Sequence, residues 1–153
     1  MLDLRIQQHF IDSADLHYQV AEALAKPVDS AVQAVLACVT GGGKVLTAGM
    51  GASSAMAQYL ALLLVGGFER ARPGLAAMAL ASDGLMATAW PEGGALARQV
   101  RALGQTGEVL VLLLADGEEG ALVEAGPAAH HRAMTAPSHP RQHGGPSRTH
   151  ATA

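Results

Sequence analysis

The residues best able to do chemistry lie in one short stretch, where a glycine-bearing turn joins an apolar segment to a helix-forming run. Residues 44–48 predict a short buried strand, Gly49 and Gly51 a turn, and Ser53 or Ser54 the start of a helix. Such a turn leaves backbone N–H groups unpaired at the positive end of the helix dipole, an arrangement that binds phosphate groups. The stretch therefore predicts an anion site. A capped turn without a ligand is the alternative, because the residues form neither a P-loop nor a complete GxGxxG sequence.

The elements that position this turn alternate between helices and strands. The pattern predicts helices over 3–25 and 28–40 separated by Pro27, a strand over 75–80, a turn at 82–84, a helix around 96–103 that ends at Gly104, a strand over 108–114 and a short helix over 118–125. The run Glu108–Leu114 shows no polar alternation, as expected for a parallel strand covered on both faces. The sequence therefore predicts a three-layer αβα sandwich with a parallel sheet, of the flavodoxin or Rossmann type.

Composition divides the chain into one domain and a tail. The 153 residues suffice for a single domain, predicted over 1–126 with its N-terminal helices in 3–40. Residues 127–153 hold four of the seven prolines, five of the seven histidines and no Val, Ile, Leu or aromatic residue, which predicts disorder. Pro140 separates His139 from His143, and no carboxylate accompanies the tail histidines, so neither a metal site nor a cofactor is expected.

Charge and cysteine content exclude some classes of partner. All thirteen Asp and Glu lie at or before Glu124 with seven of the ten Lys and Arg, a net charge of −6, while the remaining segment carries +3. An acidic body is a poor binder of nucleic acid, so no direct nucleic-acid partner is expected. The single cysteine, Cys38, forms no disulfide framework, and no apolar run approaches the roughly 20 residues that span a bilayer. These features favour a cytoplasmic protein without membrane contact.

Several motifs resemble the sugar isomerase (SIS) domain family. Residues 49–61, GMGASSAMAQYLA, are similar to the family pattern GNGxSAxxAQHFA, and 68–73, FERARP, to its aromatic-x-x-x-Arg-Pro loop. Residues 77–83, AMALASD, resemble a family strand that ends in Asp, and 97–110, ARQVRALGQTGEVL, its next helix and strand. The resemblance covers about residues 3–125. It is strongest to the phosphoheptose isomerases and to the replication-initiator-associating proteins, and FERARP and QVRALG favour the second branch.

The resemblance implies a phosphosugar site and also shows departures from the family. It assigns phosphosugar binding to Gly49, Gly51, Ser53, Ser54 and Gln58. At the position of the isomerase's catalytic glutamate the chain has Leu63, which cannot accept a proton, and at the preceding histidine position it has Tyr59. Asp83 is a weak candidate for a proton role. Its alternative is a turn residue at the end of a strand.

Two further departures concern later parts of the chain. Residues 114–119, LADGEE, stand where the family has the phosphate loop STSGNS, and their carboxylates would repel a phosphate dianion. Residues 133–135 fall where the family begins its fourth strand, after which proline-rich sequence replaces the rest. The sheet is therefore expected to be incomplete at the C-terminus.

Three functional hypotheses follow. The first is a non-catalytic module that acts through protein contacts, as a homo-oligomer (dimer or tetramer) built on helices 3–25 and 54–65, with a replication initiator protein as possible partner. The alternative is an isomerase of sedoheptulose 7-phosphate or a similar phosphosugar. The third is a chain with little function of its own, because a shortened sheet leaves an apolar edge unpaired.

Overall fold

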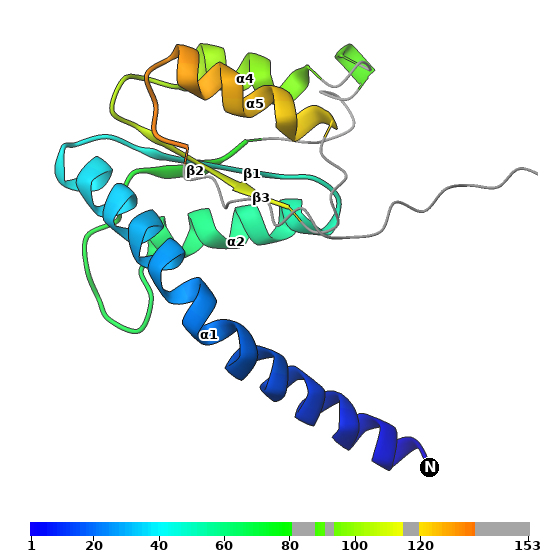
Figure 1. The fold of residues 1–153 in the computed structure, drawn as a ribbon. Coiled ribbons are helices and arrows are strands. Elements are labelled where there is room, and N and C mark those ends of the chain that lie inside the picture. Colours follow the sequence, from blue (N-terminus) through cyan, green and yellow to red (C-terminus); the bar gives the residue numbers. More distant parts are fainter. Residues whose placement is uncertain (81–87, 91–93, 115–119, 137–153) are drawn as a thin grey trace, which may run out of the picture.

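The chain folds as a three-stranded parallel sheet with helices on both faces, in a computed structural model that describes residues 1–80, 88–90, 94–114 and 120–136 (Figure 1). The elements are α1 (Leu2–Thr40), β1 (Val45–Gly49), α2 (Ala52–Gly66), β2 (Ala77–Ala79), α4 (Ala95–Leu103), β3 (Val109–Leu113) and α5 (Gly120–His131). The predicted α/β class with a parallel sheet is confirmed.

The sheet has the order β2-β1-β3, and β1 is therefore its central strand. Val45 is in register with Ala77 on one side and with Val109 on the other, and Gly49 pairs with Leu113. All five residues of β1 are buried. Thr135 adds a parallel bridge to Val109, at the position where the resemblance places the start of a fourth strand. The described sheet thus grows on the β3 side by one bridge.

Alternate side chains of the strands enter two cores. The side chains of Leu46 and Leu110, and of the residues two positions further along each strand, pack against α4 and α5. Those of Val45 and Val109 pack against α1 and α2 on the other face. Cys38 closes the second core from α1. Figure 1 shows the same two layers, with α4 and α5 on one face of the sheet and α2 on the other. The strands lack polar alternation because both of their faces are covered.

The first helix differs from the prediction. Pro27 was expected to separate two helices, but α1 runs unbroken from Leu2 to Thr40 with Pro27 inside it. Proline costs a helix one N–H bond to the carbonyl four residues before, here that of Ala23. Ala23 is exposed, so water can satisfy that carbonyl, and the apolar stripe on either side of Pro27 continues without a stop.

The last helix also corrects the prediction. The predicted domain end at residue 126 falls inside α5, which continues through Pro127 to His131. Ala128, Ala129 and Met134 are buried in the core beside α4, which gives this segment the apolar burial that its composition did not reveal. Predicted disorder of 127–153 is therefore wrong for residues 127–136, and the tail from 137 lies outside the described residues.

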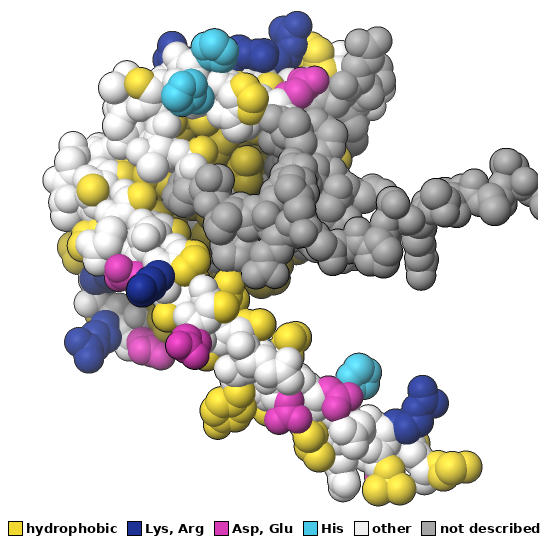
Figure 2. All heavy atoms as spheres, viewed as in Figure 1, with side chains coloured by type: hydrophobic (Ala, Val, Ile, Leu, Met, Phe, Trp, Pro, Cys, Tyr) yellow, Lys and Arg dark blue, Asp and Glu magenta, His cyan; other side chains and the backbone are white. Residues whose placement is uncertain are grey.

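The N-terminal half of α1 projects from the body (Figure 1). Residues 2–19 are all exposed, including Phe10 and Tyr18, and yellow apolar side chains mark the surface of the helix in Figure 2. Among the helices that the structure describes, α1 is the one long and apolar enough to cross a membrane. That is weak evidence, because soluble core helices and signal sequences pass the same criterion.

Candidate functional site

The turn between β1 and α2 is shaped by a close approach of two backbone segments. Gly49 is buried, and a Cβ at that position would overlap the backbone carbonyl of Ser53 and lie 3.0 Å from the Ser53 Cβ. Gly51 has φ +53°, a conformation that L side chains rarely adopt, and the space above it is open. Glycine is therefore required at the two positions for different reasons. At Gly49 a side chain would collide with the first turn of α2, and at Gly51 the backbone has a positive φ, beneath an open surface.

The helix begins one residue earlier than predicted, at Ala52, with Gly51 as its N-cap. The N–H groups of Ser53 and Ser54 donate to the carbonyls of Met50 and Gly51, at 3.0 and 3.1 Å. Within the described residues, the N–H groups of Gly51 and Ala52 make no hydrogen bond. The unpaired donors of this turn are therefore Gly51 and Ala52, at the positive end of α2.

The polar side chains predicted for this site are arranged along the first two turns of α2. Ser53 is 8% exposed and its hydroxyl has no partner in the part of the chain that the structure describes. The Ser54 hydroxyl donates to the Gly51 carbonyl at 2.7 Å, which steadies the turn. Gln58 is exposed and follows Ser54 by one helical turn, on the same side of α2. The structure thus brings the five predicted phosphosugar-binding residues together.

The topology places this turn where α/β proteins bind ligands. From the central strand β1 the chain moves to β2 on one side and then crosses to β3 on the other. The order of the sheet therefore reverses beside the carboxyl end of β1, and ligands of open α/β sheets bind at such switch points. Leu80 follows β2 at this same edge, where its N–H donates to the Thr47 carbonyl at 2.7 Å.

Other predicted site residues lie elsewhere. Asp83 and residues 115–119 of the acidic loop lie outside the described residues. Leu63 is half-buried near the far end of α2, twelve residues after Gly51. At a rise of about 1.5 Å per residue it stands roughly 18 Å from the turn. A side chain at position 63 therefore does not reach a phosphate group held at the turn of the same chain.

Two residues that hold the site in place were not singled out from the sequence. The Thr47 hydroxyl, fully buried in β1, donates to the Ala57 carbonyl at 2.8 Å and fixes α2 on the strand. A lone hydroxyl in an otherwise apolar strand was the signal available. Arg72 of the FERARP loop donates to the carbonyls of Leu63 and Leu64, both at 2.9 Å. Arg72 therefore caps the C-terminus of α2.

An ion pair closes the opposite edge of the sheet. Both carboxylate oxygens of Glu108 accept hydrogen bonds from Lys44 Nζ, at 2.7 and 2.8 Å. Oε2 also accepts the Gln105 N–H at 2.9 Å. The pair ties the start of β1 to the start of β3 and is remote from the turn. Nearby, burial raises the pKa of the Cys38 thiol. In the described segments no group of three or more His, Cys, Asp or Glu could hold a metal ion.

Comparison with known proteins identifies the fold family. The sequence model of the SIS domain family matches residues 8–136 of this chain. The chain belongs to the SIS domain family. A phosphoheptose isomerase of Methylibium petroleiphilum is 50% identical to this SIS domain over 139 residues, covering 88% of the chain and 70% of the relative. Another, from Laribacter hongkongensis, is 39% identical over 134 residues, 85% of the chain and 68% of the relative.

Solved structures agree. The phosphoheptose isomerase of Neisseria gonorrhoeae matches this SIS domain with a TM-score of 0.78 at 34% identity, over 89% of this chain and 73% of that one. The enzyme of Francisella tularensis matches with a TM-score of 0.79 at 31% identity, over the same shares.

These relatives overturn the first functional hypothesis. A non-catalytic module acting through protein contacts was expected because Leu63 replaces the family's catalytic glutamate. That expectation is wrong: the relatives are phosphoheptose isomerases, and the fold places position 63 far from the turn. None of the four supports a replication initiator as partner or the preference drawn from FERARP and QVRALG.

Proposed function

We propose that this chain binds a sugar phosphate at the β1–α2 turn and isomerises it between ketose and aldose, with sedoheptulose 7-phosphate as substrate. The names of its relatives support this proposal. The observation that carries it is the pair of unpaired N–H groups at Gly51 and Ala52, at the switch point of the sheet. Two donors beside a helix N-terminus favour a phosphate group over a neutral ligand.

The phosphate is held by this chain's own backbone and hydroxyl groups. Gly51 and Ala52 donate their N–H groups, and the dipole of α2 stabilises the negative charge. Ser53, whose hydroxyl has no other partner among the described residues, adds a third donor. Gln58, one turn after Ser54, is placed to bond a sugar hydroxyl. Ala52, Ser53 and Gln58 lie on α2, and Gly51 is the N-cap of that helix, so the ligand is positioned rather than merely attracted.

Isomerisation also needs a group that moves a proton between the two carbons next to each other in the sugar. The base removes a proton from the carbon beside the carbonyl, and the adjacent carbon receives one as the double bond shifts. We assign this role to Asp83, three residues after Leu80 in the sequence. Leu80 itself follows β2 at the carboxyl edge of the sheet.

The test is turnover of sedoheptulose 7-phosphate in deuterated water, followed by proton NMR. Isomerisation replaces a carbon-bound hydrogen next to the carbonyl with deuterium and gives rise to aldose signals. Ser53→Ala should raise KM with little change in kcat, and Asp83→Asn should abolish turnover while leaving the ligand's thermal stabilisation intact. Ser30→Ala, an exposed serine on α1, is the matched control.

The outcomes separate binding from catalysis. A ligand present at about 100 times its Kd raises the stability of the native state by roughly 2.7 kcal/mol, which shifts a melting curve visibly. Stabilisation of the wild-type chain without turnover would reject the isomerase and keep the phosphosugar site. Neither stabilisation nor turnover would reject both.

We also propose that the chain is a homo-oligomer. Exposed apolar side chains run along both helices on the α1–α2 side of the sheet: Ile6, Phe10, Val28, Val32 and Leu36 on α1, and Met56, Tyr59, Leu62 and Val65 on α2. So much exposed apolar surface is typical of an interface. Light scattering should give a mass that is a multiple of 15.6 kDa. A monomer at micromolar concentration would contradict this. The predicted cytoplasmic location stays a prediction.

A further inference from the structure

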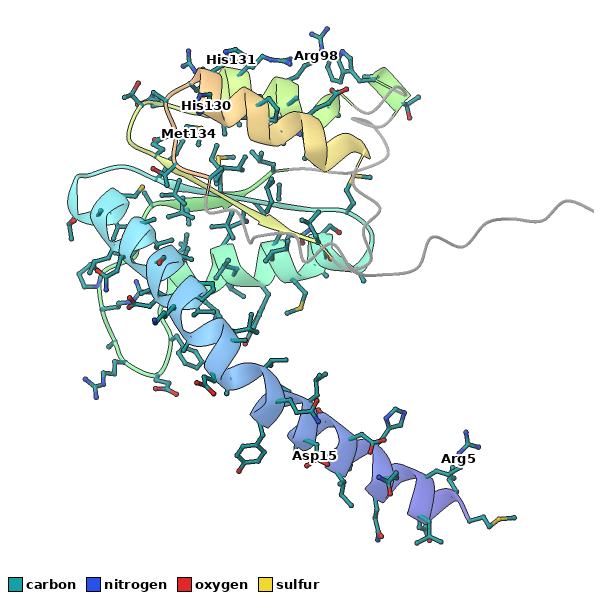
Figure 3. The ribbon with its side chains drawn as sticks, in the orientation of Figure 1. Arg5, Asp15, Arg98, His130, His131 and Met134 are labelled. Carbon is teal, nitrogen blue, oxygen red and sulfur yellow. The ribbon has the colours of Figure 1, made fainter. Side chains whose placement is uncertain are left out.

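A hollow lies in the layer formed by α4 and α5, away from the β1–α2 turn. It is an open depression of about 580 Å³ on the outer side of α4, lined by Trp90, Arg98, Gln99, Arg101 and Ala102. In Figure 3 the Arg98 side chain points away from the sheet, on the same outer side as His131 of α5. No element of the proposed phosphosugar site contributes to it.

An aromatic ring and a cation already interact in this hollow. The guanidinium carbon of Arg98 lies 5.0 Å from the centre of the Trp90 ring, within the range of cation–π attraction. The contact fixes the guanidinium by its face and leaves its N–H edge free to bond an anion. Trp90 itself is half-buried, so its ring is held in place while part of it remains open to solvent.

A second arginine stands beside the first. Arg101 follows Arg98 by three positions, so both side chains leave the same face of α4. Both are exposed, and within the described residues neither forms an ion pair or a hydrogen bond. Glu124 of α5, which lies near Gly94 at the start of α4, is exposed and pairs with neither of them. Among the residues that the structure describes, no neighbour therefore neutralises the two cations.

The surrounding surface is basic although the chain is acidic. Figure 2 shows dark blue and cyan side chains, Lys or Arg and His, gathered over α4 and α5. His130 and His131 occupy the last turn of α5, and Arg132 follows, with its Nε donating to the Gly104 carbonyl at 2.9 Å. The whole chain carries a net charge of −3, so this concentration of basic groups is local. A local positive potential attracts anionic ligands.

We propose that this hollow binds a nucleotide. Arginine guanidinium groups match the geometry of phosphate oxygens and bond them in pairs, which suits Arg98 and Arg101. A planar base can stack on the exposed part of the Trp90 ring, a contact that tolerates different bases. The combination of one ring and two unpaired guanidiniums on one helix face fits a ligand with both a flat ring and a phosphate better than either part alone.

The chain provides its own reporter, because Trp90 is its single tryptophan. Tryptophan fluorescence, excited where tyrosine does not absorb, is recorded while the full chain is titrated with ADP, with adenosine and with inorganic phosphate. ADP should quench the signal with saturation. Adenosine and phosphate should each bind at least tenfold more weakly, since each makes only half of the contacts.

Variants locate the effect. Arg98→Gln and Arg101→Gln should each weaken ADP binding by about tenfold or more, the loss expected for one charge-assisted contact. Arg5→Gln, an exposed arginine at the far end of α1 (Figure 3), is the matched control and should bind as the wild type does. Ser53→Ala should also leave the quenching unchanged, which separates this hollow from the β1–α2 turn.

Three results would overturn the proposal. They are the absence of saturable quenching at millimolar ADP, equal affinity for ADP and inorganic phosphate, and ADP binding that survives both arginine substitutions.

Discussion

The different burial of Lys44 and Glu108 predicts how much each substitution in this ion pair lowers the free energy of unfolding. The Glu108 side chain is 6% exposed, whereas that of Lys44 is 25% exposed. Removing the lysine side chain leaves a carboxylate in the protein interior with two backbone partners, the Gln105 N–H at 2.9 Å and the N–H of residue 44 at 3.4 Å, and no counter-charge among the described residues. Removing the carboxylate leaves an ammonium group on a flexible stem that can turn toward water. The two single substitutions should therefore differ in cost, although both break the same pair.

The magnitudes follow from the cost of unpaired buried charges. Breaking a buried pair by removing one partner costs about 3–5 kcal/mol when the other partner stays buried. Lys44→Met should fall in this range. Glu108→Gln keeps the shape and the acceptor for Gln105, so it should cost about 1–2 kcal/mol. Lys26→Met, an exposed lysine on α1, is the matched control and should change stability by no more than about 0.5 kcal/mol.

The assay is equilibrium unfolding in urea, read by far-UV circular dichroism, on the two single variants, the double variant and the control. The double variant should be less destabilised than the sum of the singles, because it leaves no unpaired charge. A Glu108→Gln variant as unstable as Lys44→Met, or simple additivity in the double variant, would refute the reasoning from burial.

Three further predictions concern the turn, the cap and the thiol. Gly49→Ala should cost at least about 2 kcal/mol, because the new Cβ overlaps the Ser53 carbonyl, and should remove ligand stabilisation in a melting experiment. Gly51→Ala meets open space and should cost only the roughly 1–2 kcal/mol of its positive φ. Arg72→Ala exposes the last carbonyls of α2 and should cost about 1–2 kcal/mol in urea unfolding, with Arg72→Lys restoring part of it. Burial raises the pKa of Cys38, so its thiol should react with a disulfide reagent far more slowly in the native than in the unfolded chain, and stability should fall as pH rises above the thiol's ordinary pKa.

The sequence predicted those parts of the fold whose signal is local. The strand at 44–48, the apolar run at 108–114 without polar alternation and the helix that ends at Gly104 all lie within one or two residues of β1, β3 and α4. The prediction of a turn at Gly49–Ser53 was also correct, because glycine in the sequence indicates where two backbone segments approach closely. These features depend on residues that are neighbours in the chain.

The predictions failed where distant contacts decide the structure. Pro27 was expected to separate two helices, and the last helix was expected to end at residue 125, yet α1 runs through Pro27 and α5 runs through Pro127. In α5 the deciding contacts are those of Ala128, Ala129 and Met134 with the core beside α4, and small residues give little sign of burial when they stand next to prolines and histidines. Composition alone cannot show which alanines a neighbouring helix will cover.

The error about function has the same origin. Comparing residues one at a time made Leu63 the decisive departure, because a leucine cannot act as a base. Position 63 and the turn belong to the two ends of α2, roughly 18 Å apart at about 1.5 Å per residue, so residue 63 does not take part in phosphate binding at the turn of its own chain. The turn, by contrast, lies at the switch point of the sheet with two unpaired N–H groups. Whether the chain can bind a phosphosugar is thus decided at Gly51, Ala52 and Ser53, and the identity of residue 63 leaves that capacity untouched.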